Sequence, residues 1–431
     1  MTRVRRLGLT SLALCALTSG IACSEHEFAT CDITQGACQE DVYYRVLKLR
    51  GDGYDPFGGL PPVTVISEDE FRQQLVTQAA ASQDEKNPWD KALVLLHFTT
   101  APKAAVDSDA GAGAGAGADG GAGSDAGSTT STIDDEVAHI YAFYEPEKKT
   151  ITVISHPNQT GSHVREEAMI TLAHELVHAL QDREFDLNKS DFQSSDEYFA
   201  WDAITEGDAR FYENLFTNDI RKMLGLSALD ALKLPDDELD WDYANFDQLG
   251  SPLFAARAMI YPLGAKFEAT AYRSGGNAAV RHAYAKAPRR TVGFLVGDDG
   301  QVPPVGTGDF CNAFVVRDLL PTDPADKTIG ADHFGALLLY TFLRGWNVSH
   351  DLAFTTAQTW TGDSLVVQAN HDDTISAAAW YLEFSSPPPS TIVQALTATG
   401  ELAVAANAGT LLITVADSPT PPSWTKSSIC Q

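Results

Sequence analysis

The sequence predicts an α+β fold with a mainly helical core and a β-hairpin. Apolar residues recur every three or four positions over residues 162–182, the spacing that places them on one face of an α-helix. A second helix is predicted over residues 194–216, which begin with the Ser-x-x-Glu spacing of a capping box. Residues 137–145 and 150–155 are rich in β-branched and aromatic side chains and flank a short turn, which predicts the hairpin.

The remaining elements are predicted from shorter patterns. The acidic residues 236–247 are expected to form a loop, and the chain beyond residue 387 a small β-rich tail or an extended arm. The other predicted elements are a helix over 68–82, one or two helices over 252–285 with a break at residues 275–276, helices over 334–344 and 351–360, and short strands near 365–367 and 379–384.

Composition sets broad limits on the class of protein. The 431 residues include 44% hydrophobic residues, enough for a sizeable core. The 30 basic and 58 acidic residues give a formal charge of −28. Such a field repels phosphate backbones, which argues against nucleic acid as a partner and favours an extracytoplasmic protein.

The N-terminus has the pattern of a bacterial export signal. Basic residues precede an apolar run at 7–17, and the small-residue region 20–22 follows it. Cys23 comes next, as in the lipobox of bacterial lipoproteins, although Gly20 stands where those proteins usually carry Leu. We therefore expect an exported protein that is membrane-anchored through lipidated Cys23, in the periplasm or at the cell surface, with simple secretion as the alternative. No later apolar run is long enough to span a bilayer.

Four cysteines remain for the mature protein, namely Cys31, Cys38, Cys311 and Cys430. An even number in an oxidising compartment predicts two disulfides, and three connectivities are open. We expect Cys31 to pair with Cys38 because they are close in sequence, and Cys311 to pair with Cys430. None of them forms a CxxC pair, which argues against a cysteine zinc site.

The first predicted helix carries the run His174-Glu175-Leu176-Val177-His178, an HExxH motif. Side chains four positions apart on a helix differ by about 40° in direction and about 6 Å along the axis, so two imidazoles can bind one Zn²⁺ ion. Glu175 then lies beside the metal, where it can act as general base on a zinc-activated water and afterwards as general acid toward the leaving amine. The motif predicts one zinc ion per chain.

A tetrahedral catalytic zinc site needs a third protein ligand and one open position. Glu184 would serve if the chain turned sharply after the helix, but that turn requires Gly where Gln181 stands. Glu206, in the second predicted helix, is the better candidate. The 27 residues between His178 and Glu206 then have to include a loop.

The HExxH motif followed by Glu206 resembles the gluzincins, the thermolysin-like zinc metallopeptidases. The runs HELVHALQD at 174–182 and EGDA at 206–209 are similar to those of a group of poorly characterised bacterial exported metallopeptidases. Further similarity covers most of residues 135–385, including the runs YPLG at 261–264 and WTGD at 360–363. The resemblance implies a zincin-like fold, with the hairpin or a sheet packed on the HExxH helix. It is silent on substrate.

Residue by residue, the resemblance implies His174, His178 and Glu206 as ligands and Glu175 as the base. Thermolysin-like enzymes carry an Asp four residues after the ligand Glu, and here Arg210 takes that place. Asp208 or Asp182 is therefore expected to orient a histidine, with solvated carboxylates as the alternative. The donors considered for the oxyanion of the tetrahedral intermediate are Tyr261, Tyr272 and His282.

These features together predict a zinc-dependent metallopeptidase that hydrolyses peptide bonds in an unknown peptide or protein. One alternative is a non-catalytic zinc-binding lipoprotein that uses a zincin scaffold for binding or assembly, although the presence of Glu175 favours catalysis. Another is a hydrolase of a different amide, such as a cell-wall peptide crosslink. The expected organisation is a signal peptide at 1–22, a tether at 23–41, the N-terminal part of the catalytic region at 42–106, a flexible Gly/Ala/Ser/Asp-rich insertion at 107–131, a metallopeptidase domain at 132–386 and a C-terminal tail at 387–431.

Overall fold

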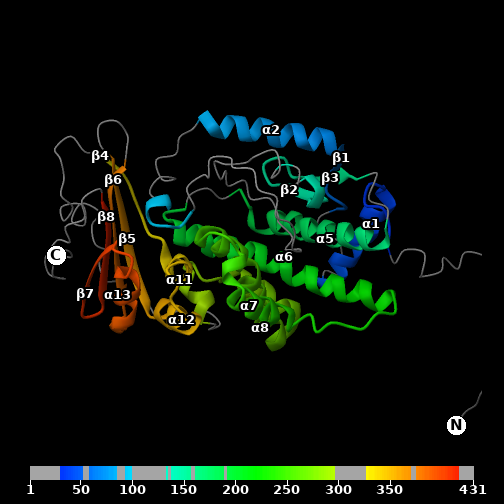
Figure 1. Ribbon diagram of the computed structural model, residues 1–431. Helices are drawn as coiled ribbons and strands as arrows, with labels where there is room; N and C mark the ends of the chain where they lie inside the picture. The colour runs from blue at the N-terminus through cyan, green and yellow to red at the C-terminus, as the bar shows by residue number, and fades with distance from the viewer. Residues whose placement is uncertain are drawn as a thin grey trace, which may run out of the picture.

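The computed structural model has an α+β architecture, as the sequence predicts (Figure 1). It describes residues 30–51, 58–84, 93–99, 133, 137–156, 161–188, 192–296, 327–369 and 375–416. The expected signal peptide, the lipidation site Cys23, the Gly-rich insertion and the second cysteine pair lie outside these residues. No helix within the described ranges has the length and apolar character needed to cross a membrane.

The described helices and strands follow the chain in a mixed order. The helices are α1 (Gly36–Leu49), α2 (Glu68–Asp84), α5 (Ser162–Phe185), α6 (Ser195–Met223), α7 (Leu234–Ala244), η1 (Phe246–Gln248), α8 (Pro252–Ala285), α9 (Val292–Val296), α11 (Gly335–Gly345), α12 (His350–Gln358) and α13 (Ser390–Thr397). The strands are β1 (Val63–Ser67), β2 (Ala142–Glu145), β3 (Thr150–Ser155), β4 (Lys327–Asp332), β5 (Trp360–Ala369), β6 (Ile375–Phe384), β7 (Ala403–Asn407) and β8 (Thr410–Ala416).

Two small sheets lie toward opposite ends of the molecule, with α5, α6 and α8 between them (Figure 1). The first has the order β1-β3-β2, in which β1 is parallel and β2 antiparallel to β3. The predicted hairpin is therefore present, although its first strand is shorter than expected: residues 137–139 are helical, and β2 begins at Ala142. Strand β2 is an edge strand that packs on α5. The second sheet is antiparallel throughout and has the order β4-β5-β6-β8-β7.

Helices α6 and α8 connect two hydrophobic clusters. Their N-terminal halves pack with α11 and the five-stranded sheet, for example through Ile204 and Leu263. Their C-terminal halves pack with α1, α5 and the hairpin, for example through Phe211 and Ala269. The EGDA run of α6 lies where one cluster passes into the other, so residues at this point can face α5.

At this point α6 and α8 meet backbone to backbone. A Cβ atom on Gly207 would lie 2.3 Å from the Gly264 Cα atom, and a Cβ on Gly264 would lie 1.7 Å from the Ala203 carbonyl oxygen. No side chain fits in either place. The glycines of the EGDA and YPLG runs are therefore required by the close approach of the two helices.

Several sequence predictions are confirmed at the level of local structure. Helix α5 covers the predicted range, and α6 begins where expected, with the Ser194 side chain accepting a hydrogen bond from the Glu197 amide. The predicted break in α8 is also present, because Gly275 and Gly276 have non-helical backbone angles. In each of these places the signal was local: apolar periodicity for α5, a capping side chain for α6 and a glycine pair for α8.

Other regions differ from expectation. Residues 236–247, expected to form a loop, lie mostly within helix α7, which begins with Pro in its first turn and buries Leu239. Beyond residue 387, the described chain to residue 416 contains α13 and the expected β-structure, but β7 and β8 belong to the five-stranded sheet, because β8 pairs with β6 along its length. In α7, tertiary packing outweighs the acidic composition. Beyond residue 387, it determines the structure of a segment whose local sequence was ambiguous.

The first described helix begins inside the segment expected to be a tether. Cys31 and Cys38 form the expected local disulfide, and Cys38 is buried at the start of α1. Helix α1 then packs on α5 and α6, burying Val42 and Val46. The chain is thus held against the core from Cys31 to the end of α1.

We predict that Gly264→Ala destabilises the fold, because the new methyl group forces α6 and α8 apart. Overpacking of this kind costs about 1–3 kcal/mol, and a clash with backbone lies at or above the upper end. Urea unfolding of the variant measures the change. Gly36→Ala is the control, since a Cβ there meets nothing within 4 Å. Unchanged stability in Gly264→Ala would mean that the helix contact is not rigid.

A second prediction concerns Asp242 of α7. Burial, with the Glu238 charge adding to it and Arg210 opposing, raises the pKa of Asp242 to about 7. In the unfolded chain the pKa of an Asp side chain is about 3.9. The folded state therefore binds the proton more tightly, and the stability gained from this binding is lost as pH rises from about 4 through about 7.

Asp242→Asn should therefore be close to wild type in stability at about pH 4 and more stable than wild type at about pH 8. Thermal unfolding at the two pH values measures the difference. The exposed Asp240→Asn on the same helix should show no such dependence. A pH-independent difference for Asp242→Asn would contradict the prediction.

Candidate metal centre

The HExxH motif lies in the middle of α5, where the helix is buried on all sides. Residues 172–182 are buried without exception, because α1, the hairpin and α6 surround the helix. His174 is 1% and His178 7% exposed. Two imidazoles in such surroundings need polar partners, and α6 together with Gln181 of α5 itself supplies them.

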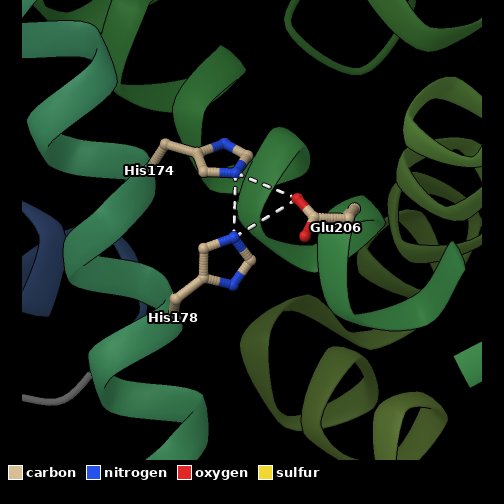
Figure 2. Close-up of side chains that lie close together, drawn as sticks. All are labelled: His174, His178 and Glu206. Carbon is tan, nitrogen blue, oxygen red and sulfur yellow. Dashed lines mark hydrogen bonds and ion pairs between the residues drawn. The ribbon is translucent and has the colours of Figure 1, made fainter. Parts of the chain in front are cut away.

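His174, His178 and Glu206 bring three potential ligand atoms together (Figure 2). The two Nε2 atoms are 3.0 Å apart, and the Glu206 Oε2 atom lies 3.2 Å from His174 Nε2 and 3.3 Å from His178 Nε2. Ligand atoms about 2.1 Å from a tetrahedral zinc ion are separated by about 3.4 Å. The triangle therefore has the dimensions of one face of a metal's coordination shell.

The second nitrogen of each imidazole is also held. His174 Nδ1 lies 2.9 Å from Glu213 Oε2, and His178 Nδ1 lies 2.9 Å from Gln181 Oε1. When Nδ1 donates its proton to such an acceptor, the lone pair of Nε2 is left to face a metal. Both histidines are thus oriented toward the same point by partners on their far sides.

Glu213 was not among the expected site residues, although the sequence contains a signal for it. It follows Glu206 by seven positions, two helical turns, and so lies on the same face of α6. Arg210, which replaces the Asp of thermolysin-like enzymes, forms ion pairs with Glu213 and with Glu238 of α7. The carboxylate that orients His174 is therefore Glu213, one helical turn beyond the position of Arg210.

Neither of the two expected orienting carboxylates contacts a histidine directly. Asp208 accepts a hydrogen bond from Gln181 Nε2 at 2.8 Å, and so reaches His178 through that amide. Asp182 instead accepts from the Tyr144 hydroxyl at 2.6 Å and pairs with Lys149. Asp182 therefore ties the hairpin to α5.

The side chain of Glu175, in α5, is buried against the hairpin. Its Oε2 atom accepts a hydrogen bond from the Tyr144 backbone amide of β2 at 2.6 Å. Because Tyr144 also contacts Asp182 through its hydroxyl, the strand is fixed to the helix one turn on either side of His178. The carboxylate next to the two histidines is thereby held in one place.

The electrostatics of the triangle favour a cation. Burial opposes charge on both groups, yet His178 and His174 hold the pKa of Glu206 well below its usual range. Against the same burial, the Glu206 carboxylate raises the pKa of His178 to about 9. Without a metal, a proton on His178 supplies the positive charge that this arrangement stabilises, and a metal ion would replace it.

The other expected residues are separated by the fold. Of the three oxyanion donors considered, Tyr261 lies beside the centre, with its ring 6.3 Å from that of His174. Tyr272 instead packs on Phe211, and His282 is exposed beyond the break in α8. Glu184, the alternative ligand, is exposed on α5 itself, because the helix continues to Phe185 without the turn it would need.

No protein-family model, curated protein or solved structure matches this chain. The interpretation of the centre therefore depends on its own geometry, which shows that His174, His178 and Glu206 could hold a metal ion.

We predict that Glu213→Gln weakens metal binding about 10–100-fold, because a neutral amide is a poorer acceptor for His174 Nδ1. Competition with a chromophoric chelator measures the affinity. Glu238→Gln is the matched control, since Glu238 also pairs with Arg210, from the other side. Equal affinities for the two variants would show that Glu213 does not act on the metal ligand.

Proposed function

We propose that this protein is a zinc-dependent metallopeptidase with a zincin-like catalytic core. The observation that carries the proposal is the triangle of His174, His178 and Glu206, with Glu175 adjacent in the same helix. Two imidazoles and a carboxylate are a ligand set typical of catalytic zinc, because three protein ligands leave the fourth tetrahedral position open. Bound zinc would supply a Lewis acid that acidifies water and polarises the substrate carbonyl.

The chain's own groups would then perform the proton transfers. The Glu175 carboxylate takes a proton from the attacking water and delivers it to the nitrogen of the leaving amine. The Tyr144 amide restricts this side chain, so little reorganisation is needed during the reaction. Tyr261, beside His174, is the proposed donor of a hydrogen bond to the developing oxyanion.

A peptide is the substrate class that best suits the surroundings of Glu175. Strand β2 is the edge strand of its sheet, and an extended peptide can pair with such an edge. The backbone of β2 also touches the proposed base directly. A peptide paired along this strand would be brought close to Glu175.

We also propose that the protein is exported and anchored through lipidated Cys23. The Cys31–Cys38 disulfide supports an oxidising compartment, since such bonds are rare in the cytosol. It lies only eight residues beyond Cys23, so the anchor would be attached close to the folded core.

The proposal predicts that Glu175→Gln retains zinc but loses peptide hydrolysis. The amide has nearly the shape of the carboxylate but cannot accept a proton, and losses from such a change are about 10²–10⁴-fold in kcat. The measurement is cleavage of an unbiased peptide library by the purified mature protein, with and without a chelator. Zinc content is determined in parallel by elemental analysis.

Cleavage by wild-type protein that a chelator stops and zinc restores is the expected result. A Glu175→Gln variant as active as wild type would contradict the proposed mechanism. A wild-type protein that binds one zinc per chain but cleaves no peptide would favour a non-catalytic zinc-binding protein instead.

A further inference from the structure

A buried hydrogen-bonded chain extends from the end of α1 to the metal centre. Arg50 Nη1 lies 2.8 Å from Asp208 Oδ2, which also accepts from Gln181 Nε2 at 2.8 Å. Gln181 Oε1 in turn lies 2.9 Å from His178 Nδ1. The Arg50, Asp208 and Gln181 side chains are 3%, 1% and 0% exposed, so solvent does not replace these contacts.

The partners of Gln181 determine which way its amide points. Its Nε2 donates to the Thr205 carbonyl oxygen at 2.9 Å and to the Asp208 carboxylate, both of which only accept. Turning the amide over would bring its oxygen against these two oxygens and leave two donors facing His178. Gln181 Oε1 is therefore the atom that faces His178, and it requires a proton on Nδ1.

Arg50 is buried in the core beside Tyr212. It follows α1 directly, and its guanidinium lies 4.6 Å from the centre of the Tyr212 ring. Asn277 donates to the Leu49 carbonyl oxygen at 3.0 Å and accepts from the Tyr212 hydroxyl at 2.8 Å. It therefore links the end of α1 to Tyr212. Such fixed surroundings keep the guanidinium directed at Asp208.

The Arg50 charge balances Asp208 directly, at 2.8 Å, and Arg281 lies close by, with its guanidinium 3.5 Å from the Arg50 carbonyl oxygen. Glu268 of α8 is fully buried, and neither of its oxygens has a hydrogen-bond partner among the described residues. Burial, followed by the nearby Asp208 charge, raises the pKa of Glu268 well above its usual range, so it enters the cluster as a neutral acid. Removing Arg50 would leave Asp208 as a buried carboxylate without its counter-charge, which is strongly unfavourable.

We infer that Arg50, Asp208 and Gln181 are positioning residues, which hold His178 in the tautomer whose Nε2 atom can bind a metal. The inference rests on the proposed metal centre and extends it to α1, more than 120 residues before the motif. Without Arg50, the Asp208 carboxylate is no longer held against Gln181 Nε2, so the amide loses a contact that fixes its direction. The amide can then turn over, and His178 Nε2 carries the proton in place of the metal.

The test compares Arg50→Met, Arg50→Lys and Gln181→Met with wild type. Arg45→Met is the matched control. Arg45 lies in α1, the helix that Arg50 follows, and pairs with Asp41 at 2.7 Å. Two properties are measured on each full-length mature protein. Zinc affinity is obtained by competition with a chelator, and the His178 tautomer by ¹⁵N–¹H NMR of the metal-free protein above the pH at which His178 is protonated.

Arg50→Met and Gln181→Met are expected to weaken zinc binding about 10–100-fold. Arg50→Lys should recover part of the loss, and Arg45→Met should bind as wild type does. In the spectra, wild-type His178 should carry its proton on Nδ1, and the two Met variants should show Nε2–H. Thermal unfolding of the metal-free proteins separates these effects from a general loss of stability.

The inference is overturned if His178 is protonated on Nε2 in wild type, or if Gln181→Met keeps both the wild-type tautomer and the wild-type affinity. It is equally overturned if Arg45→Met weakens zinc binding as much as Arg50→Met. A wild-type protein that binds no zinc while His178 shows the expected tautomer would contradict the proposed metal centre and leave the positioning of His178 supported.

Discussion

The contact on which the centre depends is the backbone approach of α6 and α8 at Gly207 and Gly264. No side chain separates the helices there, so their crossing point is determined by main-chain atoms alone. Glu206 precedes Gly207 directly, and its side chain faces His174 and His178 of α5, whereas α8 packs on the other side of α6 (Figure 2). An added methyl group at the crossing would move the ligand as well as the helix. The same backbone contact therefore determines both the packing of the helices and the position of Glu206.

The centre shows how a buried cluster of polar groups can be satisfied with few charges. His174 and His178 each have one nitrogen turned to Glu206 and the other to a fixed acceptor. The acceptor is a carboxylate for His174 and an amide for His178, so the two imidazoles are not equally polarised. The carboxylate of Glu213 is itself paired with Arg210, which limits the excess of negative charge around a single cation. The position between the three ligand atoms favours a positive charge.

Segments distant in sequence complete this arrangement. The hairpin contributes the Tyr144 amide to Glu175, and the end of α1 contributes Arg50 to the chain of contacts behind His178. Both segments precede α5, and both pack on its buried surface. Helix α5 therefore has no face left to solvent near the motif, which raises the cost of any unsatisfied polar atom. This burial is why the partners of the histidines are specific residues and not water.

Several features could be predicted from adjacent residues alone. The spacing of His174 and His178, the capping of α6 and the break in α8 each follow from a few adjacent residues, and Glu206 was identified from its motif. The partners behind the two histidines depend on the tertiary structure. Gln181 carries no local signal that distinguishes an orienting acceptor from a solvated polar residue, and Glu213 has only its spacing of seven positions from Glu206. Asp182, one of two carboxylates considered for orienting a histidine, binds the hairpin instead. Hydrogen-bond partners distant in sequence depend on how helices cross, and here that crossing is determined by two glycines whose role appears only when α6 and α8 meet.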